Sequence, residues 1–284
     1  MPNPLEKAIA AAVKSNDFQR QLFASMGTSE HPRGAVLSAY RNARRAMATA
    51  LREQYPTSAA ADVMQALQRT VKVEMRELLQ KALLGGLAEA RLQLGFYKVD
   101  VPGTFNYTDL LSQVDRAEGV ITGNVVLQAS VIDALIRGGS AEMILGDGDR
   151  IGVLRPGDVL MAGAFWLSST LWNSFSYTVN IYAKEKKLQK QAIAAIDNRT
   201  TDCCLRVHGQ IVDLDKNFKL TGTPRYADEM EWSPFHGWCR TSIALYDGTF
   251  DDGITDDMHD AASQVIDERS RGIYNTRRPA DAYG

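Results

Sequence analysis

The stretch "DNRTTDCCLRVHGQ", residues 197–210, and the stretch "SPFHGWCRT", residues 233–241, decide how we expect the C-terminal part of this chain to fold. The first contains two adjacent cysteines and a histidine, and the second contains a histidine and the only other cysteine. Thiolates and imidazoles are preferred ligands of zinc. We therefore expect the two stretches to meet at one site.

The spacing within each stretch predicts a metal-binding set of two cysteines and two histidines. Cys204 and His208 form C-x3-H, and His236 and Cys239 form H-x2-C. A short spacing lets one turn present both donors, and residues 209–235 are long enough to form a hairpin or a small lobe between the two pairs. Cys203 is a competing donor, although an extended backbone would point its side chain away from that of its neighbour.

Two other interpretations of these residues stay open. The cysteines can be buried apolar residues, with the histidines bonded to the backbone. A reactive thiol or a hydrolytic metal site would instead use His208 or His236, with carboxylates supplied by Asp202, Asp213 or Asp215. The sequence contains no nucleophile elbow, zinc-protease helix or phosphate-binding loop, so we predict no catalytic residue and no enzymatic activity.

Composition places the chain among soluble globular proteins. It has 284 residues, of which 45% are hydrophobic and 23% charged, with a net charge of −2. No apolar run is long enough for a membrane span or a secretory signal, which predicts a cytoplasmic setting. The three cysteines make a poor disulfide framework because their number is odd and they cluster.

Helical periodicity dominates the first hundred residues. Residues 32–55 and residues 58–97 each carry an apolar stripe, which predicts two helices. The glycine pair at 85 and 86 is expected to weaken or bend the helix at 58–97. An antiparallel pair of helices would bury both stripes. The basic residues on the other faces of the helix at 32–55 are Arg41, Arg44, Arg45 and Arg52.

The rest of the chain predicts an α+β fold, a mainly helical N-terminal part followed by a small mixed lobe. Pro-Gly and Gly-Asp signals predict a linker at 98–112, a short helix at 125–139 and extended pieces at 143–163. A long helix is expected at 164–196, then short strands, then an acidic helix at 256–271. We divide the chain into a helical region at 1–97 and a mixed region at 98–163. A long helix with the Cys/His lobe follows at 164–246, and an acidic helix with a tail at 247–284.

The order of residues in the two stretches resembles the signature of the phage Mu F-type head morphogenesis family, the minor head proteins of tailed phages. The resemblance covers residues 165–246, and Thr241 stands where the family often has a further cysteine. The matching positions are Asp197, Arg199, Thr200, Cys204, Gly209, Phe218, Pro234, His236, Cys239 and Arg240.

The resemblance implies a structural component of the phage head, present in few copies near the portal vertex. Its implied partners are the portal protein, the major capsid protein and packaged double-stranded DNA, and its implied location is the virion, assembled in the host cytoplasm. A structural zinc ion is the one cofactor that we expect, and Arg199 is expected to pin the lobe. The basic residues of the helix at 32–55 would contact DNA phosphates or an acidic partner.

Two other functions are kept as alternatives to the phage head protein. One is a metal-dependent hydrolase or nuclease, which would need an open metal position for water. The other is a DNA-associated binding module unrelated to phage, which would retain the same lobe.

Overall fold

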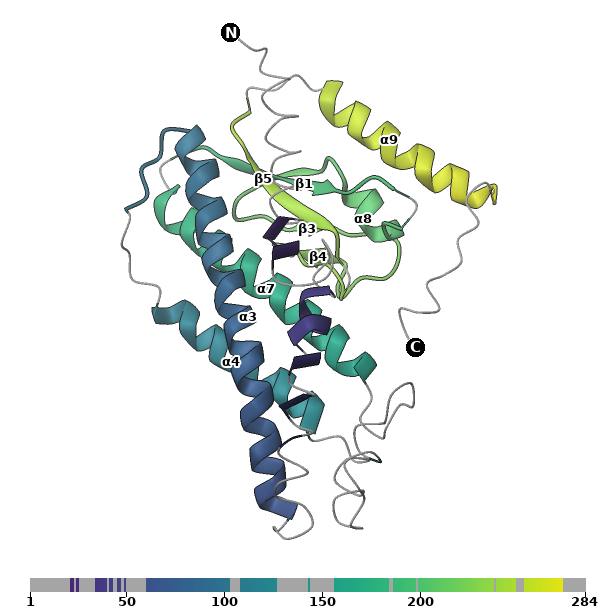
Figure 1. Cartoon of the computed structure of the whole chain (residues 1–284). Helices are drawn as coiled ribbons and strands as arrows, with labels where there is room; N and C mark the ends of the chain where they lie inside the picture. The colour runs from purple at the N-terminus through teal and green to yellow at the C-terminus, as the bar shows by residue number, and fades with distance from the viewer. Residues whose placement is uncertain are drawn as a thin grey trace. The chain divides into compact units, whose positions relative to one another are not determined.

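Figure 1 shows a computed structural model of the whole chain. A helical N-terminal part is followed by a C-terminal region with small antiparallel sheets and two helices, so the predicted α+β class is confirmed. The structure describes residues 21–22, 24–25, 34–39, 41–42, 45–46, 49, 60–102, 108–126, 143, 156–183, 186–197, 199–237, 239–248 and 253–272.

The chain divides into two units, and the division falls inside two long helices. The stretch from Asp197 to Arg240 lies wholly in the first unit. Unit 1 comprises Met1–Leu22, Leu83–Asn106 and Leu171–Gly284, and unit 2 comprises Phe23–Ala82 and Tyr107–Thr170.

Unit 2 is helical wherever the structure describes it. It contains the first part of α3 (Ala60–Phe96), α4 (Thr108–Val126) and the first part of α7 (Pro156–Tyr182). Arg76 of α3 donates to Asp115 and Glu118 of α4 at 2.7 and 2.8 Å, which ties these two helices together. Buried apolar residues recur at helical spacing, namely Val71, Met75, Leu78, Leu79 and Ala82 of α3 and Leu110, Val114, Ala117 and Ile121 of α4.

Two of the predicted non-helical stretches are wrong where the structure describes them. Helix α4 starts at Thr108, inside the predicted linker, and α7 starts at Pro156, inside the predicted extended stretch. Proline fits the first turn of a helix because its missing N–H has no partner there in any case. The pair Pro156-Gly157 therefore marks the start of α7, whereas the sequence analysis interpreted it as a turn.

The predicted helix at 125–139 cannot be compared in full, because only Val125 and Val126 are described, and they end α4. The predicted helix at 32–55 is helical at residues 34–39, 41–42, 45–46 and 49, and its other positions lie outside the described residues.

In unit 1, α3 passes through Gly85 and Gly86 without interruption, contrary to the predicted weak point. A Cβ atom at Gly86 would lie 2.0 Å from the hydroxyl oxygen of Ser174 and 2.1 Å from the carbonyl oxygen of Leu171. The same hydroxyl donates to the carbonyl of Leu83 at 2.9 Å. Glycine is therefore present because α3 and α7 approach closely at this point.

A three-stranded antiparallel sheet forms the centre of unit 1. Its strands are β1 (Gln189–Ala194), β2 (Ile211–Asp213) and β5 (Thr241–Tyr246), in the order β2-β1-β5. Figure 1 shows β1 and β5 side by side. In the register of this pair Gln191 lies opposite Ala244. The predicted helix at 164–196 is thus wrong beyond Tyr182. Five of the six residues of β1 are buried, so the strand lacks the polar alternation that marks a half-exposed strand.

Side chains from the end of α3 and from the residue after it close the outer edge of β5. The amide of Gln93 donates to the carbonyl of Ile243 and accepts from the N–H of Leu245, at 3.2 and 2.7 Å. The hydroxyl of Tyr97 donates to the carbonyl of Leu245 at 2.7 Å. These bonds satisfy groups that an edge strand otherwise leaves open.

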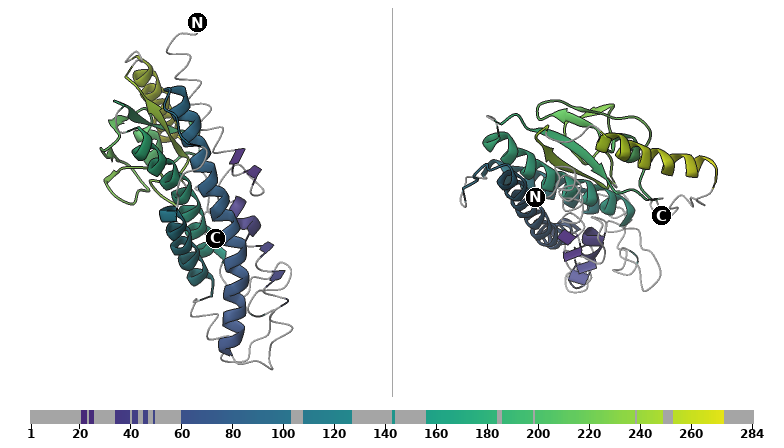
Figure 2. Two further views of the ribbon diagram at one scale, coloured as in Figure 1. Left: turned by 90° about the vertical axis from the view of Figure 1, so that its left-hand side faces the viewer. Right: turned by 90° about the horizontal axis from the view of Figure 1, so that it is seen from above.

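Three small elements and one helix complete unit 1. Helix α8 (Asp202–Val207) and the hairpin of β3 (Phe218–Lys219) and β4 (Glu229–Met230) lie between β1 and β5 in the sequence. The acidic C-terminal helix was predicted at 256–271 and is present as α9 (Gly253–Ser270), which lies beside the sheet in both views of Figure 2. Among the helices that the structure describes, none has the length and apolar content needed to cross a membrane.

Candidate metal centre

The short helix α8 positions the first candidate ligand. Thr201 is its N-cap residue, with an extended backbone and a hydroxyl oxygen that accepts from the N–H of Cys204 at 3.4 Å. This is the usual way of satisfying an N–H group in the first turn of a helix. The cap places Cys204 in that first turn, where its side chain faces the returning segment before β5.

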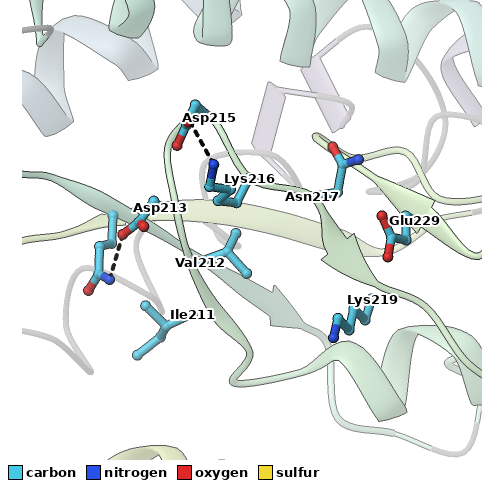
Figure 3. A pocket seen from close by; sticks show the side chains of 9 residues that line it. Ile211, Val212, Asp213, Asp215, Lys216, Asn217, Lys219 and Glu229 are labelled. Carbon is cyan, nitrogen blue, oxygen red and sulfur yellow. Dashed lines mark hydrogen bonds and ion pairs between the residues drawn. The ribbon is translucent and has the colours of Figure 1, made fainter.

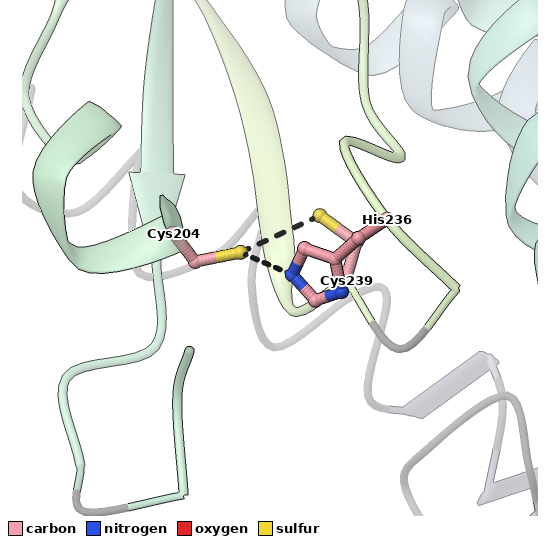
Figure 4. Close-up of side chains that lie close together, drawn as sticks. All are labelled: Cys204, His236 and Cys239. Carbon is pink, nitrogen blue, oxygen red and sulfur yellow. Dashed lines mark hydrogen bonds between the residues drawn. The ribbon is translucent and has the colours of Figure 1, made fainter. Parts of the chain in front are cut away.

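Three of the four predicted ligands meet, as Figure 4 shows. The Sγ atom of Cys204 lies 3.0 Å from Nε2 of His236 and 3.7 Å from Sγ of Cys239. The ligand atoms of all three residues lie within 4.8 Å of one another. Residues more than thirty positions apart in the sequence therefore form one cluster, which could hold a metal ion.

The cluster is almost completely shielded from solvent. Cys204 is 0% exposed, and His236 and Cys239 are each 2% exposed. Burial lowers the pKa of His236, against the opposing effect of Cys239, so its imidazole is neutral at pH 7, the form in which histidine binds metals.

The two thiols form a hydrogen-bonded pair. Burial raises the pKa of Cys204, and the hydrogen bond and charge of Cys239 raise it further. Burial alone would also raise the pKa of Cys239, but the hydrogen bond from Cys204 and the adjacent His236 bring it below its ordinary value. The pair therefore gives up its first proton at Cys239.

Hydroxyl groups surround the ligand atoms. Oγ1 of Thr201 lies 2.8 Å from Nε2 of His236. Oγ of Ser233 lies 3.5 Å from Sγ of Cys239, and it donates to the carbonyl of Thr241 at 2.7 Å. Such outer groups orient the ligands of metal sites and make their placement more rigid.

His208, the fourth predicted ligand, is not part of the cluster. Its Nδ1 atom accepts the backbone N–H of Ala194 in β1, at 2.9 Å. In the neutral imidazole Nε2 then carries the proton, so neither ring nitrogen has a free lone pair for a metal. Burial, with a smaller effect of His259, lowers the pKa of His208 to about 4.

The predicted pinning role of Arg199 belongs to Arg240. The guanidinium of Arg240 donates to the carboxylate of Asp197 at 2.6 Å and to the hydroxyl of Thr200 at 3.2 Å. The same carboxylate accepts the backbone N–H groups of Arg199 and Thr200, at 2.8 and 3.0 Å. The side chain of Arg199 is exposed. The backbone of Arg199 therefore forms part of the turn at Asp197, and the side chain of Arg240 stabilises that turn.

We call residues 189–246, which surround the cluster, the lobe. The other positions of the predicted structural motif shape this lobe. Gly209 has a φ of 85°, a left-handed conformation that favours glycine, and its N–H donates to the carbonyl of Ala192 in β1. Phe218 is fully buried against Phe235, with ring centroids 5.7 Å apart. Pro234 is buried between Ser233 and Phe235 in the segment that leads to the cluster.

The predicted DNA-contacting arginines can be described only in part. Arg41 and Arg45 are exposed in unit 2, and Arg45 donates to the side chain of Asn42 at 2.5 Å. Arg44 and Arg52 lie outside the described residues.

Sequence analysis missed Lys190, which is fully buried in β1. Its Nζ atom donates to the carbonyl of Leu214 at 2.8 Å, lies 4.3 Å from the ring centroid of Trp232 and lies 4.0 Å from a carboxylate oxygen of Glu231. Burial lowers its pKa to about 8, although Glu231 and Asp215 oppose the shift. Lys190 falls in the stretch that was predicted as the end of the helix at 164–196, and no local signal distinguishes it from the neighbouring lysines.

A groove of about 520 Å³ lies beside β2 (Figure 3). Several polar groups in its walls already have partners there, since Asp213 accepts from Gln189 and Asp215 pairs with Lys216. The side chains therefore do not converge on a vacant point, and we assign the groove no chemistry.

Comparison with known proteins gives no relative of this chain. No family model, no curated protein and no solved structure matches it.

Proposed function

We propose that this chain is a structural minor head protein of a tailed phage, with a C-terminal lobe that a zinc ion fastens. The observation that carries the proposal is the meeting of Cys204 with His236 and Cys239, at 3.0 and 3.7 Å. These residues come from the two stretches whose order resembles the phage head family. The ion pair of Asp197 and Arg240 joins the same two stretches a second time.

The separation of the sulfur atoms suits zinc. Zinc–sulfur bonds of about 2.3 Å in a tetrahedron place two sulfur atoms about 3.8 Å apart. The two Sγ atoms of the cluster are 3.7 Å apart. The same tetrahedron places sulfur and imidazole nitrogen about 3.5 Å apart, so His236 would withdraw slightly from Cys204 on binding. Two thiolates also neutralise the charge of the ion, which favours its burial.

Burial favours a structural role for this ion over a catalytic one. A catalytic zinc keeps a position open for water and substrate. The three protein ligands leave one tetrahedral position, but all three residues are at most 2% exposed, which keeps substrate away from that position. A structural ion would add folding free energy to a lobe that has only short strands.

Metal content tests the fastening directly. We expect one zinc ion per chain by elemental analysis of the purified protein, and loss of that ion in Cys204→Ser and His236→Ala. Two matched controls should keep it: Cys203→Ser, which removes the neighbouring buried thiol, and His208→Asn, which removes the histidine outside the cluster. Zinc lost in His208→Asn but kept in His236→Ala would overturn the assignment of ligands.

Assembly tests the setting. The proposed partners are the portal protein, the major capsid protein and packaged DNA. We expect the purified chain to co-migrate with a portal ring in size-exclusion chromatography, in several copies per ring. A chain that never associates with portal or capsid protein would instead be a binding module unrelated to phage.

The contribution of the exposed arginines to DNA binding has its own test. Arg41→Ala with Arg45→Ala should reduce retention on duplex DNA at low salt, and the retention should fall steeply as salt rises. Retention that is the same in the double variant would remove this contact from the proposal.

A further inference from the structure

We infer that Cys204 and Cys239 form a redox pair, which closes as a disulfide when the metal is absent and an oxidant is present. This inference deepens the proposed function, on which it rests in one respect: the metal and the disulfide would use the same two sulfur atoms. The metal would fasten the lobe in a reducing compartment, and the disulfide would fasten it in an oxidising one.

The geometry selects one pair out of three thiols. The Sγ atoms of Cys204 and Cys239 are 3.7 Å apart, within van der Waals contact, across 35 positions of the sequence. A disulfide requires them to approach by about 1.7 Å, to a bond length of about 2.05 Å. Figure 4 shows the two side chains pointing toward one another from α8 and from the segment before β5. Cys203 is the adjacent residue of α8 and is not a member of this cluster.

Contacts that do not use the thiols also hold the two segments together. Thr201 caps α8 on one side, and Ser233 holds the carbonyl of Thr241 on the other. The ion pair between Asp197 and Arg240 joins the same two segments independently of the thiols. We therefore expect both thiols to stay close together after loss of the metal, so that oxidation needs no large rearrangement.

The chemistry balances with hydrogen peroxide as the oxidant. The sulfur of Cys239, which accepts the hydrogen bond of Cys204, attacks one oxygen of the peroxide, and its own proton passes to the departing hydroxide. The O–O bond breaks, leaving a sulfenic acid and one water. The sulfur of Cys204 then attacks the sulfur of Cys239, the S–O bond breaks, and the second oxygen leaves as water with the proton of Cys204. Two thiols and one peroxide give one disulfide and two waters.

A phage protein meets both conditions in its proposed setting. It is assembled in the reducing cytoplasm, where thiols and metal sites persist, and the released particle is outside the cell, where disulfides are stable. Burial of both sulfur atoms limits access to small oxidants that enter during local opening.

Counting free thiols in the full chain tests the inference. Metal is removed with a chelator, the protein is treated with hydrogen peroxide, and free thiols are then counted with a maleimide reagent in denaturant. We expect the count to fall from three to one, with the remaining label on Cys203 and a cross-linked peptide that joins Cys204 to Cys239 by mass spectrometry. The oxidised chain should also unfold at a higher urea concentration than the reduced, metal-free chain.

Variants sharpen the test. Cys203→Ser should still form the disulfide and retain no free thiol, whereas Cys239→Ser should form no intramolecular disulfide. A cross-link that contains Cys203 overturns the inference. It is also overturned if the chain keeps three free thiols under conditions in which a reference dithiol, treated in parallel, is fully oxidised. The metal content of the untreated protein is measured separately. If the purified chain contains no metal but still forms this disulfide, the proposed zinc site is wrong and the redox pair stands. If the chain contains zinc but forms no disulfide after its removal, the redox pair is wrong and the zinc site stands.

Discussion

The carboxylate of Asp197 and the guanidinium of Arg240 lie 2.6 Å apart, across 43 positions of the sequence. They join the turn before α8 to the start of β5, beside the Cys/His cluster. Burial alone would raise the pKa of Asp197. The hydrogen bond and charge of Arg240, with the bonds from Arg199 and Thr200, lower it to about 2.

Removal of this arginine should destabilise the lobe more than removal of an exposed one. Arg240→Ala leaves a half-buried carboxylate without its main partner, and we expect it to lower the free energy of unfolding by about 1 to 2 kcal/mol in urea at pH 7. Arg206→Ala is the matched control, because Arg206 pairs with Asp202 at 2.8 Å on the surface. That exposed pair should contribute less than about 0.5 kcal/mol. Equal losses in the two variants would contradict the pinning role of Arg240.

The same ion pair predicts a dependence on acid. The folded pKa of Asp197 is below its ordinary value of 3.8, so its contribution is complete above pH 3.8 and is lost as the pH falls from there to about 2. Because a third of the side chain is exposed, we expect the loss to be about 1 kcal/mol. Asp197→Asn should remove this part of the acid dependence in urea titrations at stepped pH. An unchanged pH profile in that variant would contradict the lowered pKa.

His208 predicts a second dependence on pH, in a higher window. Its folded pKa of about 4 is below the ordinary value of 6.5. Between pH 6.5 and pH 4 this histidine is therefore protonated in the unfolded chain but not in the folded chain. The free energy of unfolding falls as the pH drops through this window. Protonation would also abolish the acceptor for the N–H of Ala194. The expected loss is roughly 2 to 3 kcal/mol over this window.

His208→Asn provides the comparison, because its amide oxygen can accept the same N–H without titrating. The difference in unfolding free energy between wild type and this variant should narrow as the pH falls from 6.5 to 4. His259→Asn, a change on α9, should leave most of the dependence intact, since burial is the larger cause of the shift. A constant difference across this window for His208→Asn would show that His208 titrates normally.

The sequence predicted the composition of the site better than its surroundings. Residue type and spacing were enough to select Cys204, His236 and Cys239, because short motifs of strong ligands are local features. His208 was also selected, since the strand that occupies its nitrogen had been interpreted as helix. The partner of His208, Ala194, lies in β1, which pairs with residues 241–246. Such a pairing is non-local and leaves no periodic signal in a buried strand.

The helices were predicted well where a stripe of apolar residues was long. The predicted 58–97 is α3 at Ala60–Phe96, and the acidic C-terminal helix is α9. The fully buried Lys190 was not predicted, because its environment is made by Leu214 and Trp232 from distant turns. Tertiary contacts of this kind override the ordinary preference of lysine for the surface.

Lys190 predicts a gain of stability in alkali. Its folded pKa of about 8 is below the ordinary 10.5, so the folded chain loses this proton before the unfolded chain does. The free energy of unfolding should therefore rise between pH 8 and pH 10.5, by roughly 2 kcal/mol. Lys190→Met keeps the length of the side chain and should abolish this rise. At pH 7 the substitution should cost less than about 1.5 kcal/mol, because the lost bond to Leu214 is offset by removal of a buried charge.

The close approach of α3 and α7 gives the last prediction, which compares two glycines of one helix. Gly86→Ala would place a methyl group about 2 Å from Ser174 and from the backbone of Leu171. The backbone cannot yield cheaply, so we expect a loss of about 2 to 3 kcal/mol in unfolding free energy. Gly95→Ala has no atom within 4 Å of the added Cβ, and it should stabilise α3 by about 0.5 to 1 kcal/mol. Urea denaturation of both variants should shift the midpoint in opposite directions. A midpoint that rises in both variants would mean that α3 and α7 do not meet at Gly86 in solution.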